Sequence, residues 1–213
     1  MKFKTIFWDN DGTLVNTEPL YFKATQQVLA TIGIDLTRDW YINVQLKKGL
    51  SAFDLAFEKG LNETEVQALR NKRNEIYMHL LQIDSPVIDH VIPTLEKLRG
   101  KIPMGVVTSS HRDHFETIMK ASDLKKYFDF TICNDDVIKD KPNPEPYLKA
   151  WEQSGFKKEE CLVIEDTERG VTAAKAAGLT CFACPTELSS TNDFSNADKQ
   201  INNVSEILDY FDV

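Results

Sequence analysis

Two carboxylates follow an apolar run near the N-terminus. The segment KTIFWDNDGTL places Asp9 and Asp11 after aromatic and β-branched residues that predict a buried strand, and Gly12 then ends the pattern. Two residues apart in an extended chain, both carboxylates would point to the same side. One carboxylate can attack an electrophilic atom while the other transfers protons, so this spacing suits nucleophilic catalysis combined with acid and base catalysis.

Three further segments carry polar side chains just past a predicted strand. In open α/β sheets, ligands bind outside the carboxyl ends of the strands, so these segments are expected to converge with Asp9 and Asp11. They are Thr108-Ser109-Ser110, Lys141 in DDVIKDKPNPEP, and Glu165-Asp166.

Negative charge at this edge predicts a metal ion. Asp9, Asp11 and Asp166 would lie in one crevice, where like charges are unfavourable unless a cation offsets them. No histidine or thiolate is placed to help, and oxygen ligands suit Mg²⁺ better than zinc. We therefore expect Asp9, Asp11 and Asp166 to hold Mg²⁺, with Glu165 adjacent.

The same edge is suited to a phosphoryl group. A phosphate monoester carries close to two negative charges, which must be neutralised before an anionic nucleophile can attack. Lys141 and the cation would supply positive charge, and Thr108 would donate its hydroxyl. Backbone N–H groups near a helix N-terminus also bind anions, so Thr108, Ser109 and Lys141 are the predicted phosphate-binding residues.

The elements that position these residues alternate after Pro86. Helices are expected at about 92–99, 112–121, 145–154 and 168–177, with a last one near 204–211. The intervening strands are expected at 104–107, 130–133, 161–164 and 180–184. This alternation predicts a Rossmann-like parallel sheet with helices on both faces.

The block between the first strand and this alternation has a helical apolar period instead. Tyr21, Ala24, Val28 and Leu29 follow three-and-four spacing, and no convincing strand occurs. The expected organisation is therefore a discontinuous α/β catalytic domain at 1–16 and 88–213, with an all-α cap inserted at 17–87.

Composition narrows the class of protein. The 213 residues are 42% hydrophobic and 27% charged with a net charge of −8, and no segment approaches the roughly 20 apolar residues of a membrane span. The net negative charge argues against a nucleic-acid or membrane surface. No export signal is visible, so a cytoplasmic location is expected. Cys181 and Cys184 form a C-x-x-C on a predicted strand, where cysteines act as small core residues.

These residues resemble the haloacid dehalogenase-like hydrolase superfamily, in the subgroup with an inserted α-helical cap that includes phosphoglycolate phosphatase and β-phosphoglucomutase. The match covers nearly the whole chain through four ordered motifs: Asp9-x-Asp11-Gly12-Thr13-Leu14, Thr108-Ser109-Ser110 after a strand, Lys141-Pro142 with Pro144, and Glu165-Asp166-Thr167 with Gly170.

The resemblance implies roles for these residues. Asp9 would be the nucleophile, and Asp11 the general acid and base and a metal ligand through its backbone carbonyl. Asp166 would be a metal ligand beside Glu165. The implied activity is a Mg²⁺-dependent phosphatase that hydrolyses a small phosphorylated metabolite through an aspartyl phosphate. The motifs specify neither the substrate nor the oligomeric state.

Departures from the family pattern bear on the cap. Asn16 stands at the hinge where many relatives carry Asp. The sugar phosphomutase branch uses an arginine and a histidine where this chain has Ala52 and Tyr21, so a sugar phosphomutase is the less favoured alternative. Candidate substrate contacts are Lys48 and Ser51 in the cap loop LKKGLSA, and Ser110 and His111 at the sheet edge. Lys48 has a simpler interpretation as a solvated loop residue, and His111 as part of the first exposed turn of a helix.

Two other activities fit the motifs less well. A phospho-accepting receiver domain also combines acidic residues, a hydroxyl and a lysine, but it has no helical insertion, and its acceptor aspartate follows a middle strand. Here Thr108 follows the strand ending at Val107. A metal-independent dehalogenase would lack the second aspartate, so Asp11 argues against that reaction.

Overall fold

A computed structural model describes residues 3–46, 50–83 and 86–212 of the chain. The chain divides into two compact units. We call residues 1–16 together with 86–213 the sheet unit, and residues 17–85 the helical unit. The predicted boundary at residue 88 lies two residues beyond this division, because Asn16 N donates to Pro86 O at 2.8 Å and Val15 pairs with Val87.

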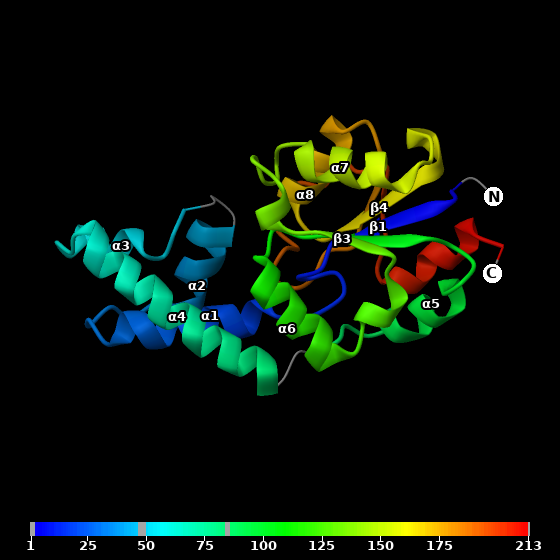
Figure 1. The fold of residues 1–213 in the computed structure, drawn as a ribbon. Helices are drawn as coiled ribbons and strands as arrows, with labels where there is room; N and C mark the ends of the chain where they lie inside the picture. Colours follow the sequence, from blue (N-terminus) through cyan, green and yellow to red (C-terminus); the bar gives the residue numbers. More distant parts are fainter. Residues whose placement is uncertain (1–2, 47–49, 84–85, 213) are drawn as a thin grey trace. The chain divides into compact units, whose positions relative to one another are not determined.

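Six parallel strands form the sheet unit (Figure 1), which confirms the predicted α/β fold class. Their spatial order is β3-β2-β1-β4-β5-β6, and each neighbouring pair is parallel. The strands are β1 (Thr5–Trp8), β2 (Met104–Val107), β3 (Phe130–Ile132), β4 (Cys161–Glu165), β5 (Thr180–Ala183) and β6 (Lys199–Gln200).

The central strands are apolar on both faces. Every residue of β1, β2 and β4 is buried, as expected for strands that helices cover on both sides. Gly105 of β2 makes room for a large neighbour, because a Cβ there would lie 2.3 Å from the Phe130 ring. That ring then packs edge-on against Phe7 at a centroid distance of 6.0 Å. The middle of the sheet is thus closely packed.

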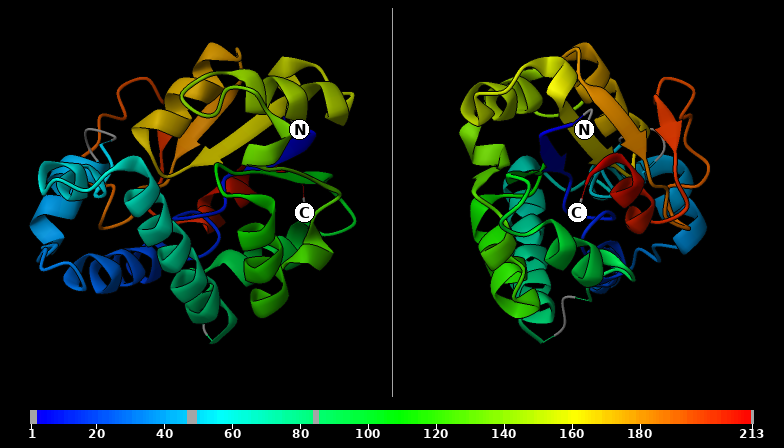
Figure 2. Two further views of the ribbon diagram at one scale, coloured as in Figure 1. Left: turned by 60° about the vertical axis from the view of Figure 1, so that its left-hand side comes forward. Right: turned by 90° about the vertical axis from the view of Figure 1, so that its right-hand side faces the viewer.

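Helices cover both faces of this sheet (Figures 1 and 2). Buried residues of two of them, including Tyr147, Ala150 and Val171, join Phe7 and Val163 of the strands in one hydrophobic cluster. The helices of the sheet unit are α5 (Val91–Leu98), α6 (Arg112–Ser122), α7 (Glu145–Ser154) and α8 (Glu168–Ala176), with 3₁₀ turns η2 (Lys125–Tyr127), η3 (Asn134–Asp136), η4 (Lys158–Glu160) and η5 (Val204–Tyr210).

Two elements at the C-terminal end differ from the sequence-based prediction. The last helix is the 3₁₀ segment η5, and it follows β6, which was not predicted. β6 has only two residues, Lys199 and Gln200, so no alternation of polar and apolar residues could indicate it. Its flanks join β5 through Asp198 N to Cys181 O at 2.9 Å and Ile201 N to Ala183 O at 2.8 Å.

The helical unit contains no strand in its described residues. Its helices are α1 (Glu18–Ala30), α2 (Arg38–Trp40), the π-helical turn η1 (Tyr41–Leu46), α3 (Asp54–Glu58) and α4 (Glu63–Ile83). Val28 and Leu29 of α1 share a core with Val66 of α4. Arg73 is buried in the same unit, with its guanidinium 4.2 Å from the centre of the Tyr21 ring.

In the ranges that the structure covers, no helix is both long enough and apolar enough to cross a membrane.

Candidate active site

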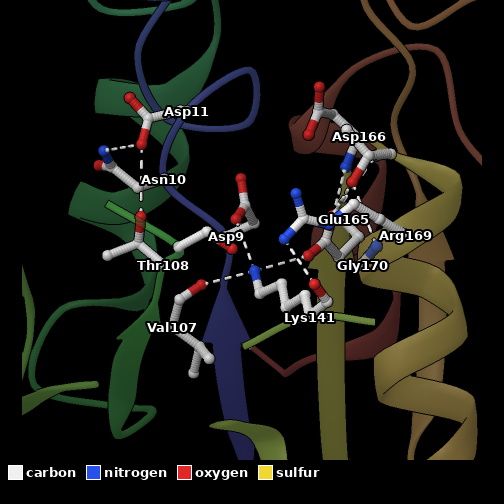
Figure 3. A network of polar contacts seen from close by, with 12 residues as sticks. Asp9, Asn10, Asp11, Val107, Thr108, Lys141, Glu165, Asp166, Arg169 and Gly170 are labelled. Carbon is white, nitrogen blue, oxygen red and sulfur yellow. Dashed lines mark hydrogen bonds and ion pairs between the residues drawn. The ribbon is translucent and has the colours of Figure 1, made fainter. Parts of the chain in front are cut away.

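Parallel pairing brings the predicted site residues to one edge of the sheet. Asp9 follows β1 and donates its backbone N–H to Ile164 O of β4 at 2.9 Å. Thr108 follows β2 and bonds in the same way to Ile132 O of β3 at 2.9 Å. Asp166 follows directly after β4. Three neighbouring strand ends therefore present Asp9, Thr108 and Asp166 together (Figure 3).

A buried lysine lies at the centre of this edge. Lys141 comes from the loop between η3 and α7, and its Nζ donates to Asp9 Oδ1 and Glu165 Oε1, each at 2.7 Å, and to Val107 O at 2.8 Å. All three donor positions of the ammonium group are thus used. Lys141 was expected at this edge as a phosphate-binding residue, and in the structure its ammonium group contacts the nucleophile candidate Asp9.

Burial and neighbouring charges change the proton affinities of Asp9 and Lys141. Burial raises the pKa of Asp9 to about 7, and the neighbouring charges of Glu165 and Asp11 act in the same direction, while Lys141 opposes them. Burial alone would lower the pKa of Lys141, but the carboxylates of Asp9 and Glu165 outweigh it and raise that pKa. Lys141 is therefore a permanent positive charge at neutral pH.

Glu165 serves as the fixed partner of this lysine. Its Oε1 accepts from Lys141 and, at 2.8 Å, from the hydroxyl of Tyr147. Its Oε2 accepts from Asp166 N at 3.2 Å and from Thr167 Oγ1 at 3.1 Å. Gly170 leaves space for this carboxyl group, because a Cβ at residue 170 would lie 1.8 Å from Cδ of Glu165.

Three buried carboxylates at this edge could hold a metal ion. Ligand oxygens of Asp9, Glu165 and Asp166 all lie within 4.8 Å of one another. Gly12 gives Asp166 its place, because the residue has a φ of +93° and a Cβ there would lie 2.2 Å from Asp166 Oδ2. A donor set made only of oxygens fits a hard divalent cation. Since Glu165 already accepts five hydrogen bonds, Asp9 and Asp166 are the carboxylates best placed for direct ligation.

The Asp11 carboxylate lies apart from that group. Its Oδ2 accepts from Ser110 Oγ at 2.8 Å, Asn10 Nδ2 at 3.0 Å and Thr108 Oγ1 at 3.3 Å. The expectation that Asp9 and Asp11 point the same way assumed an extended chain through residue 11. In the structure β1 ends at Trp8, and a turn in which Asn10 O accepts three backbone N–H groups separates the two carboxylates.

The remaining predicted residues have different surroundings. The Ser109 hydroxyl donates to Asp140 Oδ1 at 2.8 Å. His111 faces Asp135, with 3.4 Å between its Nδ1 and Oδ2, and its side chain is well exposed. In the helical unit, Ser51 Oγ accepts from Phe53 N at 3.2 Å next to the start of α3. Lys48 lies outside the described residues.

The cysteines behave as core residues. Cys181 is buried on β5 and Cys184 is half-buried just after that strand, and both thiols are free. Burial raises the pKa of Cys184 to about 11 and that of Cys181 well above its usual value.

Three residues of the site were not singled out from the sequence. Tyr147 occupies a buried position of α7 and reads as an ordinary apolar position in that helix. Asp140 and Arg169 form an ion pair of 2.9 Å across 29 positions of the chain, and such a pair leaves no local pattern. Only Asp140 gave any signal, through its position directly before Lys141.

A parallel α/β sheet whose carboxyl edge carries a buried lysine among carboxylates defines the class of this protein. A family model for haloacid dehalogenase-like hydrolases matches residues 6–184. The chain belongs to the haloacid dehalogenase-like hydrolase family, as its motifs predict. This result argues against the alternative of a phospho-accepting receiver domain.

Named relatives include phosphatases. The phosphorylated carbohydrates phosphatase of Thermotoga maritima is 31% identical over 180 residues, covering 83% of this chain and 82% of the relative. The fructose-1-phosphate phosphatase YqaB of Escherichia coli is 27% identical over 178 residues, covering 84% of this chain and 94% of the relative. A crystal structure from Thermotoga maritima, provisionally described as a β-phosphoglucomutase, superimposes with a TM-score of 0.78 at 27% identity, covering 97% of both chains.

Proposed function

We propose that this hydrolase is a Mg²⁺-dependent phosphatase that acts on a small phosphorylated metabolite through an aspartyl phosphate at Asp9. The observation that carries the proposal is the position of Lys141, whose buried ammonium group contacts Asp9 and Glu165 at 2.7 Å beside Asp166. A fixed positive charge next to a carboxylate nucleophile is what an anionic phosphate ester requires. The names of the relatives favour a phosphorylated carbohydrate as the substrate.

Asp9 is the nucleophile in this proposal. Lys141 donates to Oδ1, so Oδ2 is the oxygen that attacks. The Oδ2–P bond forms while the bond between phosphorus and the leaving alcohol oxygen breaks. Water then attacks phosphorus, the Oδ2–P bond breaks, and inorganic phosphate leaves. Lys141 favours the ionised form of Asp9 that the first step needs.

Asp11 is the proposed acid and base. It gives its proton to the leaving alkoxide in the first step and takes a proton from the attacking water in the second. Its contacts with the hydroxyls of Thr108 and Ser110 hold its carboxyl group close to the residues that would bind phosphate. Asp9, which is bonded to Lys141, has different contacts, and these support a separate role.

The proposed phosphate-binding groups are Lys141, the Thr108 hydroxyl and the backbone of Ser109, which precedes α6. Asp9 and Asp166 would hold Mg²⁺ with the Asp11 carbonyl, the last on the family resemblance. The bound ion would supply positive charge to the phosphoryl oxygens and offset the crowded carboxylates. The helical unit is assigned the role of the cap, also on that resemblance.

The decisive experiment measures release of inorganic phosphate from a panel of phosphorylated carbohydrates with and without Mg²⁺. We expect turnover only with Mg²⁺, and loss of at least about 10³-fold in kcat for Asp9→Asn, since nucleophile removal in covalent catalysis has effects of this order or larger. Asp123→Asn is the matched control, because the Asp123 carboxylate pairs with Lys126 at the surface. Full activity of Asp9→Asn would refute the proposed mechanism.

A sugar phosphomutase is the second candidate, favoured by the 27% identity to the Thermotoga maritima structure. A mutase would convert one sugar phosphate into an isomer without net release of phosphate. Measuring both products from a hexose 1-phosphate separates the two activities, and isomer formation in excess of phosphate release would favour the mutase.

A further inference from the structure

The loop that carries Lys141 needs external support. Residues 137–144 contain neither helix nor strand, yet Lys141 Nζ reaches three acceptors at 2.7–2.8 Å. One end of the loop is tied to α7, because Glu145 accepts from the backbone N–H groups of Ile138 at 2.8 Å and Lys139 at 2.9 Å. The part of the loop next to Lys141 is held differently.

Asp140 connects this part of the loop to two other segments. Its Oδ1 accepts from Ser109 Oγ at 2.8 Å, and its Oδ2 accepts from Arg169 at 2.9 Å. The same guanidinium nitrogen of Arg169 also donates to the backbone carbonyl of Lys141 (Figure 3). Ser109 follows Thr108, and Arg169 lies in the first turn of α8, three residues after Asp166.

We propose that Asp140 and Arg169 are positioning residues that hold Lys141 in register with the phosphate-binding segment at Thr108-Ser109. The inference rests on the proposed phosphatase function. Arg169 bridges the side chain of residue 140 and the main chain of residue 141, so it fixes the point from which the lysine side chain starts. Ser109 bonds the same carboxylate, so displacement of the loop also displaces the backbone beside Thr108.

The pair is better suited to local geometry than to global stability. The Arg169 side chain is 52% exposed and that of Asp140 is 23% exposed. Ion pairs this close to solvent contribute little to the free energy of unfolding. Small errors in the position of a phosphate-binding group, in contrast, reduce catalysis strongly.

Arg169→Met keeps most of the side-chain stem and removes both hydrogen bonds. We expect kcat/KM for a phosphate monoester to fall roughly 10-fold, and the inhibition constant of inorganic phosphate to rise by a similar factor. Tm should stay close to that of the wild type. Arg169→Lys should recover part of the loss, because an ammonium group can still donate to Asp140 and to the Lys141 carbonyl.

Lys175→Met is the matched control on the same helix. Lys175 also joins a carboxylate, Asp198 at 2.6 Å, to a backbone carbonyl, Leu179 O at 3.2 Å, with 32% side-chain exposure. It is not bonded to the Lys141 loop. This variant should therefore match the wild type in kcat/KM and in inhibition by phosphate.

Binding of inorganic phosphate provides a readout that does not depend on turnover. A ligand that binds the folded state raises Tm with its concentration, so a weaker phosphate site gives a smaller shift. We expect the shift to be reduced in Arg169→Met and in Asp140→Ala, not reduced further in the double variant, and normal in Lys175→Met.

The proposed function and this inference fail in different ways. Absence of Asp9-dependent phosphatase activity in the wild type would refute the function. An active wild type whose Arg169→Met variant equals Lys175→Met in both kcat/KM and phosphate-induced Tm shift would refute the positioning role alone. Additive losses in the double variant would also contradict the idea that Asp140 and Arg169 act as a unit.

Discussion

The hydroxyl of Tyr147 lies 2.8 Å from Oε1 of Glu165, the same oxygen that accepts from Lys141. Burial raises the pKa of Tyr147 well above its usual value, and the charge of Glu165 acts in the same direction. The phenol therefore stays protonated and donates a hydrogen bond to the carboxylate. Tyr147 thus supports the carboxylate that holds Lys141.

Tyr147→Phe should lower the free energy of unfolding by about 1.5–3 kcal/mol, the range for a hydrogen bond to a charged group. The ring that fills the core is retained, so the effect isolates the hydroxyl. Tyr127→Phe is the control, because its longer bond to Glu96, 3.3 Å, is partly exposed. Urea denaturation of both variants measures the difference, and equal losses would contradict the special role of Tyr147.

Lys141→Met should be more harmful than any loss of a single hydrogen bond. It leaves the carboxylates of Asp9 and Glu165 buried without their shared cation, and removal of one partner of a buried ion pair costs about 3–5 kcal/mol. Adding Glu165→Gln should restore part of the stability, because one uncompensated charge is removed, but no activity. If the second substitution instead lowers Tm further, the assigned charge balance is wrong.

Gly170→Ala tests the close contact with Glu165. At an ordinary helix position, alanine in place of glycine stabilises by about 1 kcal/mol. Here the new Cβ would lie 1.8 Å from Cδ of Glu165, so the substitution should destabilise the protein instead. Phosphatase activity should also fall, because the Glu165 carboxylate is displaced. Differential scanning calorimetry reports the sign directly. A rise in Tm would show that Glu165 has room to move.

Removal of the metal can be observed without turnover. Mg²⁺ should raise the Tm of the wild type in a concentration-dependent way after treatment with EDTA, because the proposed site at Asp9 and Asp166 would bind the ion only in the folded state. Asp166→Asn should abolish this shift. Asp198→Asn, which removes a carboxylate paired with Lys175 on the surface, should preserve it. A normal Mg²⁺ response in Asp166→Asn would exclude Asp166 as a ligand.

The thiols predict a pH dependence of stability. Burial raises the pKa of Cys184 from 9.0 to about 11 and that of Cys161 to about 11 as well. Between pH 9 and about pH 11 the thiols of the unfolded chain have lost protons that the folded chain keeps. The folded state therefore binds more protons, and the free energy of unfolding falls as pH rises above about 9. Native protein should also alkylate slowly with iodoacetamide at pH 8, and rapid labelling of Cys184 would contradict the assigned burial.

Much of the fold follows from local pattern. The apolar runs that become β1, β2 and β4, and the helical period of α1 and α4, each lie within a few consecutive residues. Element type is a local property when burial has a clear period, so the α/β alternation was predictable. β6 and η5 were not, because a two-residue strand and a 3₁₀ turn lack a period.

The order of the strands along the chain indicated which segments meet at the sheet edge. Because Asp9, Thr108 and Asp166 each follow a parallel strand, their convergence at one edge could be stated from the sequence. Only the tertiary structure decided which oxygen each donor meets. Lys141 donates to Oε1 of Glu165, and the Asp11 carboxylate accepts from Ser110. Arg169 donates to Asp140, 29 positions away along the chain. Side-chain partners come from segments far apart in sequence, whereas local periodicity reports burial and not the identity of a neighbour.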